Sequence, residues 1–114
     1  MTKTTLTFTR KVALILLVII LMALDFAADA ATHHIEMQNM KFVPDSLEIK
    51  SGDVVIFTNK SNLLHNVVSP KNKIRSKMLK KGDKFEYKFE SVGLVEYYCE
   101  PHRNHGMKGK VDVK

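Results

Sequence analysis

The sequence is poor in several residue types that often stabilise a small protein. It has 114 residues with one cysteine, no tryptophan and only three prolines. A single cysteine excludes an intrachain disulfide framework and any metal site that takes two thiolates from one chain. An excess of negative charge is also missing, because 18 Lys and Arg outnumber 12 Asp and Glu, which excludes an acidic, disordered chain. The length excludes two ordinary domains, so we expect one hydrophobic core.

The longest hydrophobic run lies near the N-terminus and predicts an export signal. Lys3, Arg10 and Lys11 precede an unbroken apolar run over residues 12–24, and the small residues Ala-Asp-Ala end at Ala30. As a helix these thirteen residues cover about 20 Å, which is too short for a hydrocarbon core of ~30 Å. We therefore expect the first thirty residues to be a signal peptide that is cleaved after Ala30, and not a retained membrane anchor.

Export decides the environment of the mature domain, residues 31–114. We expect this single domain in the periplasm or another extracytoplasmic space, without stable membrane insertion. There an unpaired thiol such as Cys99 is open to oxidation and to intermolecular disulfide formation. Burial, a cysteine on another chain or a bound metal would each protect it. Despite the net charge of +6, nucleic acid is not an expected partner, because export separates the protein from the nucleic acid of the cell.

The mature sequence is typical of short strands and has no convincing long helix. Apolar and charged residues alternate most clearly over residues 84–90. Residues 47–50 also alternate, and residues 54–57 form a continuous β-branched and aromatic run that is typical of a strand buried on both faces. We expect these last two strands to be neighbours in a sheet. Further strands are predicted over residues 34–37, 65–69, 94–99 and 108–113.

The regions between these strands are short and rich in turn residues. Residues 71–81 show weak helical spacing, but six of these eleven residues are basic, so we expect a loop or one turn there. Several short strands with such turn spacing predict an all-β fold, an antiparallel sandwich or barrel.

The residues that carry chemistry lie near the C-terminus. Cys99, His102 and Met107 follow one another at intervals of three and five residues. Thiolate, imidazole and thioether groups are all soft or borderline metal donors. Pro101, next to these donors, tightens the segment and Gly106 allows it to turn, so the segment can surround one ion from one side.

His65 is the predicted fourth donor. It lies in the apolar stretch LLHNVV, where an imidazole needs a partner. Two His and one Cys with a weak axial Met form the ligand set of electron-transfer copper. The alternative is a buried core thiol at Cys99, with His102 and His105 as surface residues and Met107 at the start of a strand. A zinc site is disfavoured because a thioether is not among the usual zinc ligands.

The segments MKFVPDSLEIKSGDVVIFTN, LLHNVV and VGLVEYYCEPHRNHGMKGKVDV resemble the cupredoxin family over nearly all of the mature chain. The spacing of the donors is more similar to that of plastocyanins and pseudoazurins than to that of amicyanins. The resemblance implies a Greek-key β-sandwich of seven or eight strands with one type 1 copper near one end. It also implies His65, Cys99, His102 and Met107 as ligands, with the backbone of Asn66 helping to fix the Cys99 sulfur.

These ligands predict a small exported blue copper protein that transfers single electrons between redox partners through Cu(I) and Cu(II). The resemblance implies that His102 lies at an apolar surface edge, where electrons leave. An enzyme is not expected, because the mature chain offers one candidate site and no sign of a substrate pocket. The alternative is an exported copper carrier or copper-resistance protein that holds the same ion for delivery. We expect a monomer.

The new N-terminus is a candidate for a second, non-blue site. Cleavage after Ala30 leaves Ala31, Thr32 and His33, whose amine, amide and imidazole nitrogens can form a square-planar Cu(II) or Ni(II) site. The alternative is an untethered terminus with incidental histidines.

A strongly basic stretch is a candidate docking patch. Its six cationic residues would select an acidic face on a redox partner such as a cytochrome or a dehydrogenase. The alternative is a solvated loop that keeps a β-protein soluble and protects its edge strands. The residues are Lys71, Lys73, Arg75, Lys77, Lys80 and Lys81.

Overall fold

The computed structural model describes residues 9–18 and 29–114. Residues 9–18 are α-helical, and no helix within the described ranges is long and apolar enough to span a membrane. The predicted signal peptide lies mostly outside the described residues, so its cleavage after Ala30 stays a prediction.

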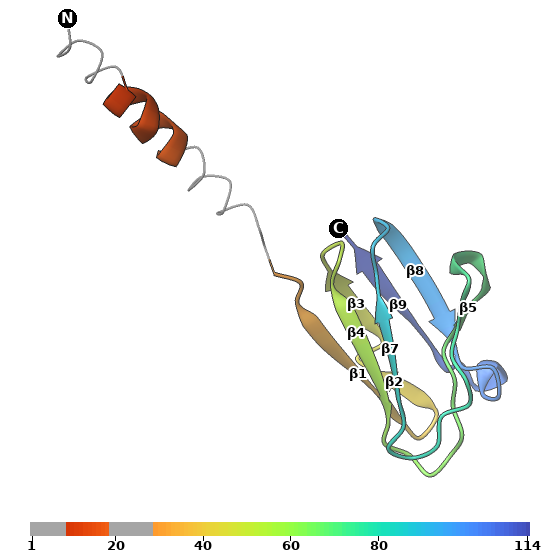
Figure 1. Cartoon of the computed structure of the whole chain (residues 1–114). Helices are drawn as coiled ribbons and strands as arrows, with labels where there is room; N and C mark the ends of the chain where they lie inside the picture. Colours follow the sequence, from red (N-terminus) through yellow and green to blue (C-terminus); the bar gives the residue numbers. More distant parts are fainter. Residues whose placement is uncertain (1–8, 19–28) are drawn as a thin grey trace, which may run out of the picture.

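Two facing β-sheets make up the rest of the described chain (Figure 1). The first sheet has four strands in the order β2-β1-β4-β7. They are β1 (Thr32–Gln38), β2 (Lys41–Val43), β4 (Val54–Asn59) and β7 (Lys84–Lys88). The second sheet has five strands in the order β3-β9-β8-β5-β6. They are β3 (Ser46–Ile49), β5 (Val68–Ser69), β6 (Ile74–Arg75), β8 (Gly93–Tyr98) and β9 (Lys108–Val113).

This architecture confirms the predicted all-β sandwich, with nine strands in the described residues where seven or eight were expected. The sandwich is not purely antiparallel as predicted, because β1 pairs in parallel with β4 and β3 with β9. The two strands β2 and β6 were missed because two or three residues are too few to show a period. The basic stretch over residues 71–81 is mostly loop, as predicted, and begins in the 3-10 turn η1 (Pro70–Asn72). The predicted strand over residues 65–69 is shorter, since only its last two residues belong to β5.

The prediction that β3 and β4 are neighbours is wrong. β3 pairs in parallel with β9, whereas β4 lies between β1 and β7 in the other sheet. The turn between them crosses from one layer to the other, since Ser51 N–H donates to the Lys114 carbonyl and Gly52 N–H to the Phe89 carbonyl. β4 is also less buried than expected, because Val54 and Ile56 on its outer face are only half-buried.

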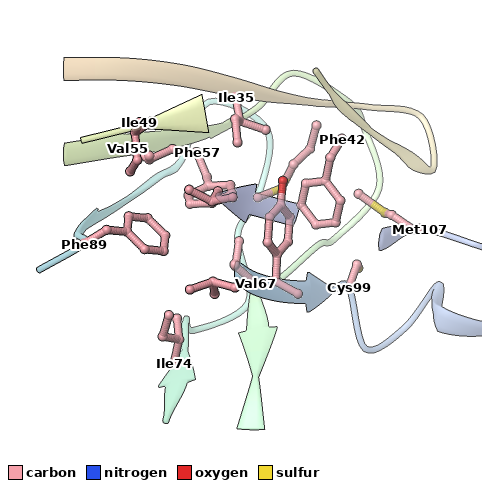
Figure 2. Packing of buried hydrophobic residues seen from close by; sticks show 14 of the residues in the cluster. Ile35, Phe42, Ile49, Val55, Phe57, Val67, Ile74, Phe89, Cys99 and Met107 are labelled. Atoms are coloured by element: carbon pink, nitrogen blue, oxygen red, sulfur yellow. The ribbon is translucent and has the colours of Figure 1, made fainter. Parts of the chain in front are cut away.

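The core between the sheets is closely packed (Figure 2). Tyr97 belongs to this core. Its ring meets those of Phe42 and Phe57 edge-on, at centroid distances of 4.8 and 5.3 Å. Across the β8–β9 pair it faces Gly109, where even a Cβ atom would collide with the tyrosine ring. This packing fixes β8 and β9 against each other, directly beside the residues that follow β8.

Asp53 fastens the start of β1 to the turn before β4. Its carboxylate accepts hydrogen bonds from Ala31 N–H at 3.0 Å, Lys50 N–H at 3.0 Å and the His33 ring at 2.9 Å. The bond from His33, followed by those from the two backbone N–H groups, lowers the pKa of Asp53 to about 2. The ionised carboxylate is therefore the form that the folded chain stabilises.

Replacing Asp53 by Asn is expected to lower the melting temperature at neutral pH, because a neutral amide accepts these bonds more weakly. The contribution of the carboxylate is complete above its ordinary pKa of 3.8 and is lost as the pH falls towards about 2. Between these pH values the melting temperature of the wild type should therefore fall more steeply than that of Asp53→Asn. Circular dichroism melts measure this, and parallel pH profiles would contradict the role of Asp53.

Candidate metal centre

Three connections meet at one end of the sandwich (Figure 1). They follow β4, β6 and β8, and comprise residues 60–67, 76–83 and 99–107. The chain ends at the opposite end of the sandwich (Figure 1). The four predicted donors all lie in the first and third of these connections.

His65, Cys99 and His102 bring their side-chain donor atoms together at this end. The Nδ1 atoms of the two histidines are 3.1 Å apart, and each lies 3.5 Å from the Cys99 sulfur. Bonds of about 2.0–2.3 Å to a shared ion place two donors of a trigonal set roughly 3.5 Å apart. The three groups therefore fit one small metal ion without rearrangement, and they form the one such cluster of three or more His, Cys, Asp or Glu donors in the described residues.

Cys99 directly follows β8 and has no exposed surface. Burial raises the pKa of its thiol, while the backbone N–H groups of Asn66 and His102 oppose this effect. A bound cation favours the thiolate strongly enough to deprotonate a coordinating thiol. The two N–H groups then remain as donors to the sulfur.

His65 is fixed by an isolated β-bridge to Leu79 from the second connection. The backbone bonds of this bridge are 3.2 Å and 2.7 Å long. The His65 ring is fully buried, and this burial, followed by repulsion from His102, lowers its pKa. A neutral imidazole has a lone pair available for a metal.

Met107 closes the third connection beside Cys99. Cys99 N–H donates to the Met107 carbonyl at 3.0 Å, and Met107 N–H donates to the His102 carbonyl at 3.3 Å. Between them the 3-10 turn η2 (Arg103–His105) ends at Gly106, whose φ of 74° suits glycine. Met107 is buried and lies with Cys99 at the same end of the core, away from Phe89 (Figure 2).

Asn66 holds the first and third connections together. Its side-chain oxygen accepts a hydrogen bond from Glu100 N–H at 2.8 Å, and its amide donates to the Glu100 carboxylate at 3.4 Å. Arg75 forms a two-bond ion pair with the same carboxylate, at 2.8 and 2.9 Å. Of the other residues near the donors, Pro101 and His105 are exposed.

Two polar residues that the sequence did not reveal, Ser61 and Asn59, lie behind His65. The Ser61 hydroxyl is 2.8 Å from Nε2 of His65 and bonds to the Asn59 side chain. In the sequence they belong to the polar stretch NKSN, which is typical of an ordinary turn. No spacing rule singles them out.

The predicted N-terminal site is not near this cluster. Ala31 and His33 are both bonded to Asp53, and Thr32 begins β1. Binding of Cu(II) by the terminal nitrogens would require these residues to leave Asp53, and such binding stays a prediction.

The basic stretch runs along the sheet from one end to the other. Asn72 at its start lines a hollow together with residues 91 and 92, in the turn between β7 and β8. Arg75 lies midway and is already paired with Glu100. Lys77, Lys80 and Lys81 flank Leu79 and so lie at the end that holds the donor cluster.

Apolar side chains are exposed at the same end. Leu63 and Leu64 directly precede His65, and Met78 directly precedes its bridge partner Leu79. Their exposed fractions are 43%, 51% and 45%. His102 is partly exposed, so one residue of the cluster reaches the protein surface.

Comparison with known proteins places the chain among copper proteins. Residues 29–114 match the family model of copper-binding proteins of the plastocyanin/azurin family. Plastocyanin from Vicia faba is 31% identical over 87 residues, which cover 65% of this chain and 88% of that protein. Amicyanin-alpha from Methylorubrum extorquens is 33% identical over 92 residues, 76% of each chain. A solved Cu(I) form of an amicyanin variant superposes with a TM-score of 0.68 at 29% identity, covering 79% of this chain and 88% of the other.

Proposed function

The chain belongs to the plastocyanin/azurin family of copper-binding proteins, with copper as its cofactor, and from this we propose that it carries single electrons between redox partners through one type 1 copper. The observation that carries the proposal is the buried cluster of two Nδ1 atoms and one thiol at mutual distances of 3.1–3.5 Å. Bound copper supplies the one-electron Cu(I)/Cu(II) couple.

Four side chains hold the copper in this proposal. His65, Cys99 and His102 form the trigonal set, and the buried Met107 is the weak axial donor. Protein groups then occupy all four coordination positions, whereas a catalytic metal site keeps one position open for water or substrate. This argues for a carrier and not for an enzyme.

Retention of the ion suits electron transfer better than delivery. His65 and Cys99 are fully buried, and Asn66 and Leu79 hold the connections that carry them. An acceptor protein could reach only the partly exposed edge at His102. We therefore favour electron transfer over the copper-delivery alternative.

Electrons leave through His102 at the apolar end surface. Leu63, Leu64 and Met78 surround this end with exposed apolar side chains, which suit a small and transient contact. Lys77, Lys80 and Lys81 lie beside the same end and form no side-chain ion pair within residues 9–18 and 29–114. An acidic redox partner, such as a cytochrome or dehydrogenase, would be steered by these charges.

The proposed location is extracytoplasmic. The basic and apolar N-terminal segment supports export, with cleavage after Ala30. The proposed exported form is a monomer of residues 31–114.

Replacing Cys99 by Ser is expected to abolish the intense visible band of the Cu(II) protein, because that band requires a thiolate bound to Cu(II). Absorption spectra of the wild type and the variant, both loaded with Cu(II), measure this. Replacing the exposed His105 by Ala is the control and should leave the band unchanged. A wild type that binds copper without this band would refute the type 1 assignment.

Replacing Met107 by Leu is expected to keep the blue colour and raise the reduction potential. Loss of a weak axial donor disfavours Cu(II) more than Cu(I). A tenfold change in their relative affinities corresponds to about 59 mV for one electron, and we expect a rise of this order. Protein-film voltammetry measures it, and a fall in potential would contradict the axial role.

Reversing Lys77 and Lys80 to Glu is expected to slow electron exchange with an acidic c-type cytochrome on the order of tenfold at low salt. The effect should shrink as the Debye length falls from about 30 Å at 0.01 M salt to about 10 Å at 0.1 M. The matched control reverses Lys71 and Lys73, which lie toward the other end of the stretch. Stopped-flow rates that respond equally to both double variants would argue against docking at the copper end.

A further inference from the structure

The outer nitrogen of His65 is bonded to the hydroxyl of Ser61. Nε2 and the Ser61 oxygen are 2.8 Å apart, and both residues are buried, with exposed fractions of 0% and 8%. A histidine that binds a metal through one ring nitrogen nearly always donates the N–H of the other to a fixed acceptor. Ser61 is in the position of that acceptor.

The bonds of the Ser61 hydroxyl are all satisfied when the ring proton of His65 is on Nε2. Nδ1 of His65 faces Cys99 and His102, where it would bind the metal. Because a metal-binding nitrogen carries no proton, the proton of the His65 ring is on Nε2. The Ser61 oxygen then accepts from Nε2–H and from Leu63 N–H, which is 3.2 Å away. Its own proton is free to donate to the Asn59 side-chain oxygen at 3.0 Å or to the Leu63 carbonyl at 3.3 Å. One donor and two acceptor positions, the full capacity of a hydroxyl, are thereby used.

Asn59 anchors this hydroxyl to the backbone around His65. The Asn59 side-chain oxygen also accepts from Ser61 N–H at 2.9 Å. Its amide donates to the carbonyls of Leu63 at 2.8 Å and Leu79 at 2.9 Å. Leu79 is the β-bridge partner of His65, so the same network fixes both the main chain and the ring of this residue. Asn59 itself is fully buried.

The opposite tautomer fits this surrounding poorly. If Ser61 donated its proton to Nε2, the Asn59 oxygen would lose its hydroxyl donor. Nδ1 of His65, which lies 3.1 Å from Nδ1 of His102 and 3.5 Å from the Cys99 sulfur, would then carry a proton that points into the donor cluster. That proton would occupy the direction in which a metal must bind.

We propose that Ser61 is a positioning residue for copper, whose hydroxyl, anchored by Asn59, holds His65 in the tautomer with the proton on Nε2 and with Nδ1 facing the metal. This inference rests on the proposed role of His65 as a ligand. Removal of the hydroxyl leaves the buried ring N–H with only the backbone of Asn39 as a hydrogen-bond partner and weakens the hold on the ring. Loss of such a partner typically weakens metal binding on the order of 10–100-fold.

The test compares Ser61→Ala with two matched variants. Ser61→Thr keeps the hydroxyl. Ser69→Ala removes another buried hydroxyl, which bonds to the Glu96 carbonyl and to Asn72 and touches none of the donors. Competition with a Cu(I) chelator should show affinity lowered on the order of 10–100-fold in Ser61→Ala alone, with recovery in Ser61→Thr. Equal losses in Ser61→Ala and Ser69→Ala would reduce Ser61 to a structural role and overturn the proposal.

A measurement on the wild type keeps the proposal testable even if Ser61→Ala does not fold. In the diamagnetic Cu(I) protein, NMR should detect the Nε2 proton of His65 as a slowly exchanging signal close to the Ser61 Hβ protons. Rapid exchange of this proton with solvent would overturn the proposal. A wild type without the blue Cu(II) band would instead refute the proposed function, so the two failures are distinguishable.

Discussion

The close approach of two imidazoles and one thiol at the end of a rigid sandwich is the constraint on which the rest of the structure depends. The thiol and one imidazole come from the connection between β8 and β9. The residues on either side of this connection, Tyr98 and Lys108, are paired in the sheet. The backbone bond from Cys99 to Met107 closes this loop. Tight packing of Tyr97 against Gly109 holds the two strands in place. Strand pairing therefore positions the donors that this connection carries.

Burying donors carries a desolvation cost, and the surrounding polar groups offset it. A buried imidazole or thiol without partners is unfavourable, and burial lowers the pKa of His65 and raises that of Cys99. On the inner side these groups face one another, as ligands of one ion must. On the outer side Ser61 and Asn66 connect them to the backbone of neighbouring loops. One set of polar contacts thus stabilises the fold and orients the donors.

The same end of the molecule combines contact surface with charge. Exposed Leu64 and Met78 lie next to the backbone that carries His65, and Lys77 and Lys80 lie next to Met78. An apolar centre with a basic margin suits brief encounters, in which charge accelerates approach and a small dry contact allows rapid separation. Arg75 contributes less to such a margin, because its charge is paired with Glu100.

The sequence by itself determined the fold class and identified the donors. Strand alternation and the Cys-His-Met spacing are local properties, so they can be recognised in the sequence alone. The strands over residues 84–90 and 108–113 follow from alternation or turn signals alone. What the tertiary structure decided depends on contacts between distant segments. β3 and β4, adjacent in the chain, lie in opposite sheets because each buries one face in the same core. Likewise, only the folded chain places Ser61 behind His65, since a serine in a polar turn carries no periodic signal of what its hydroxyl will meet.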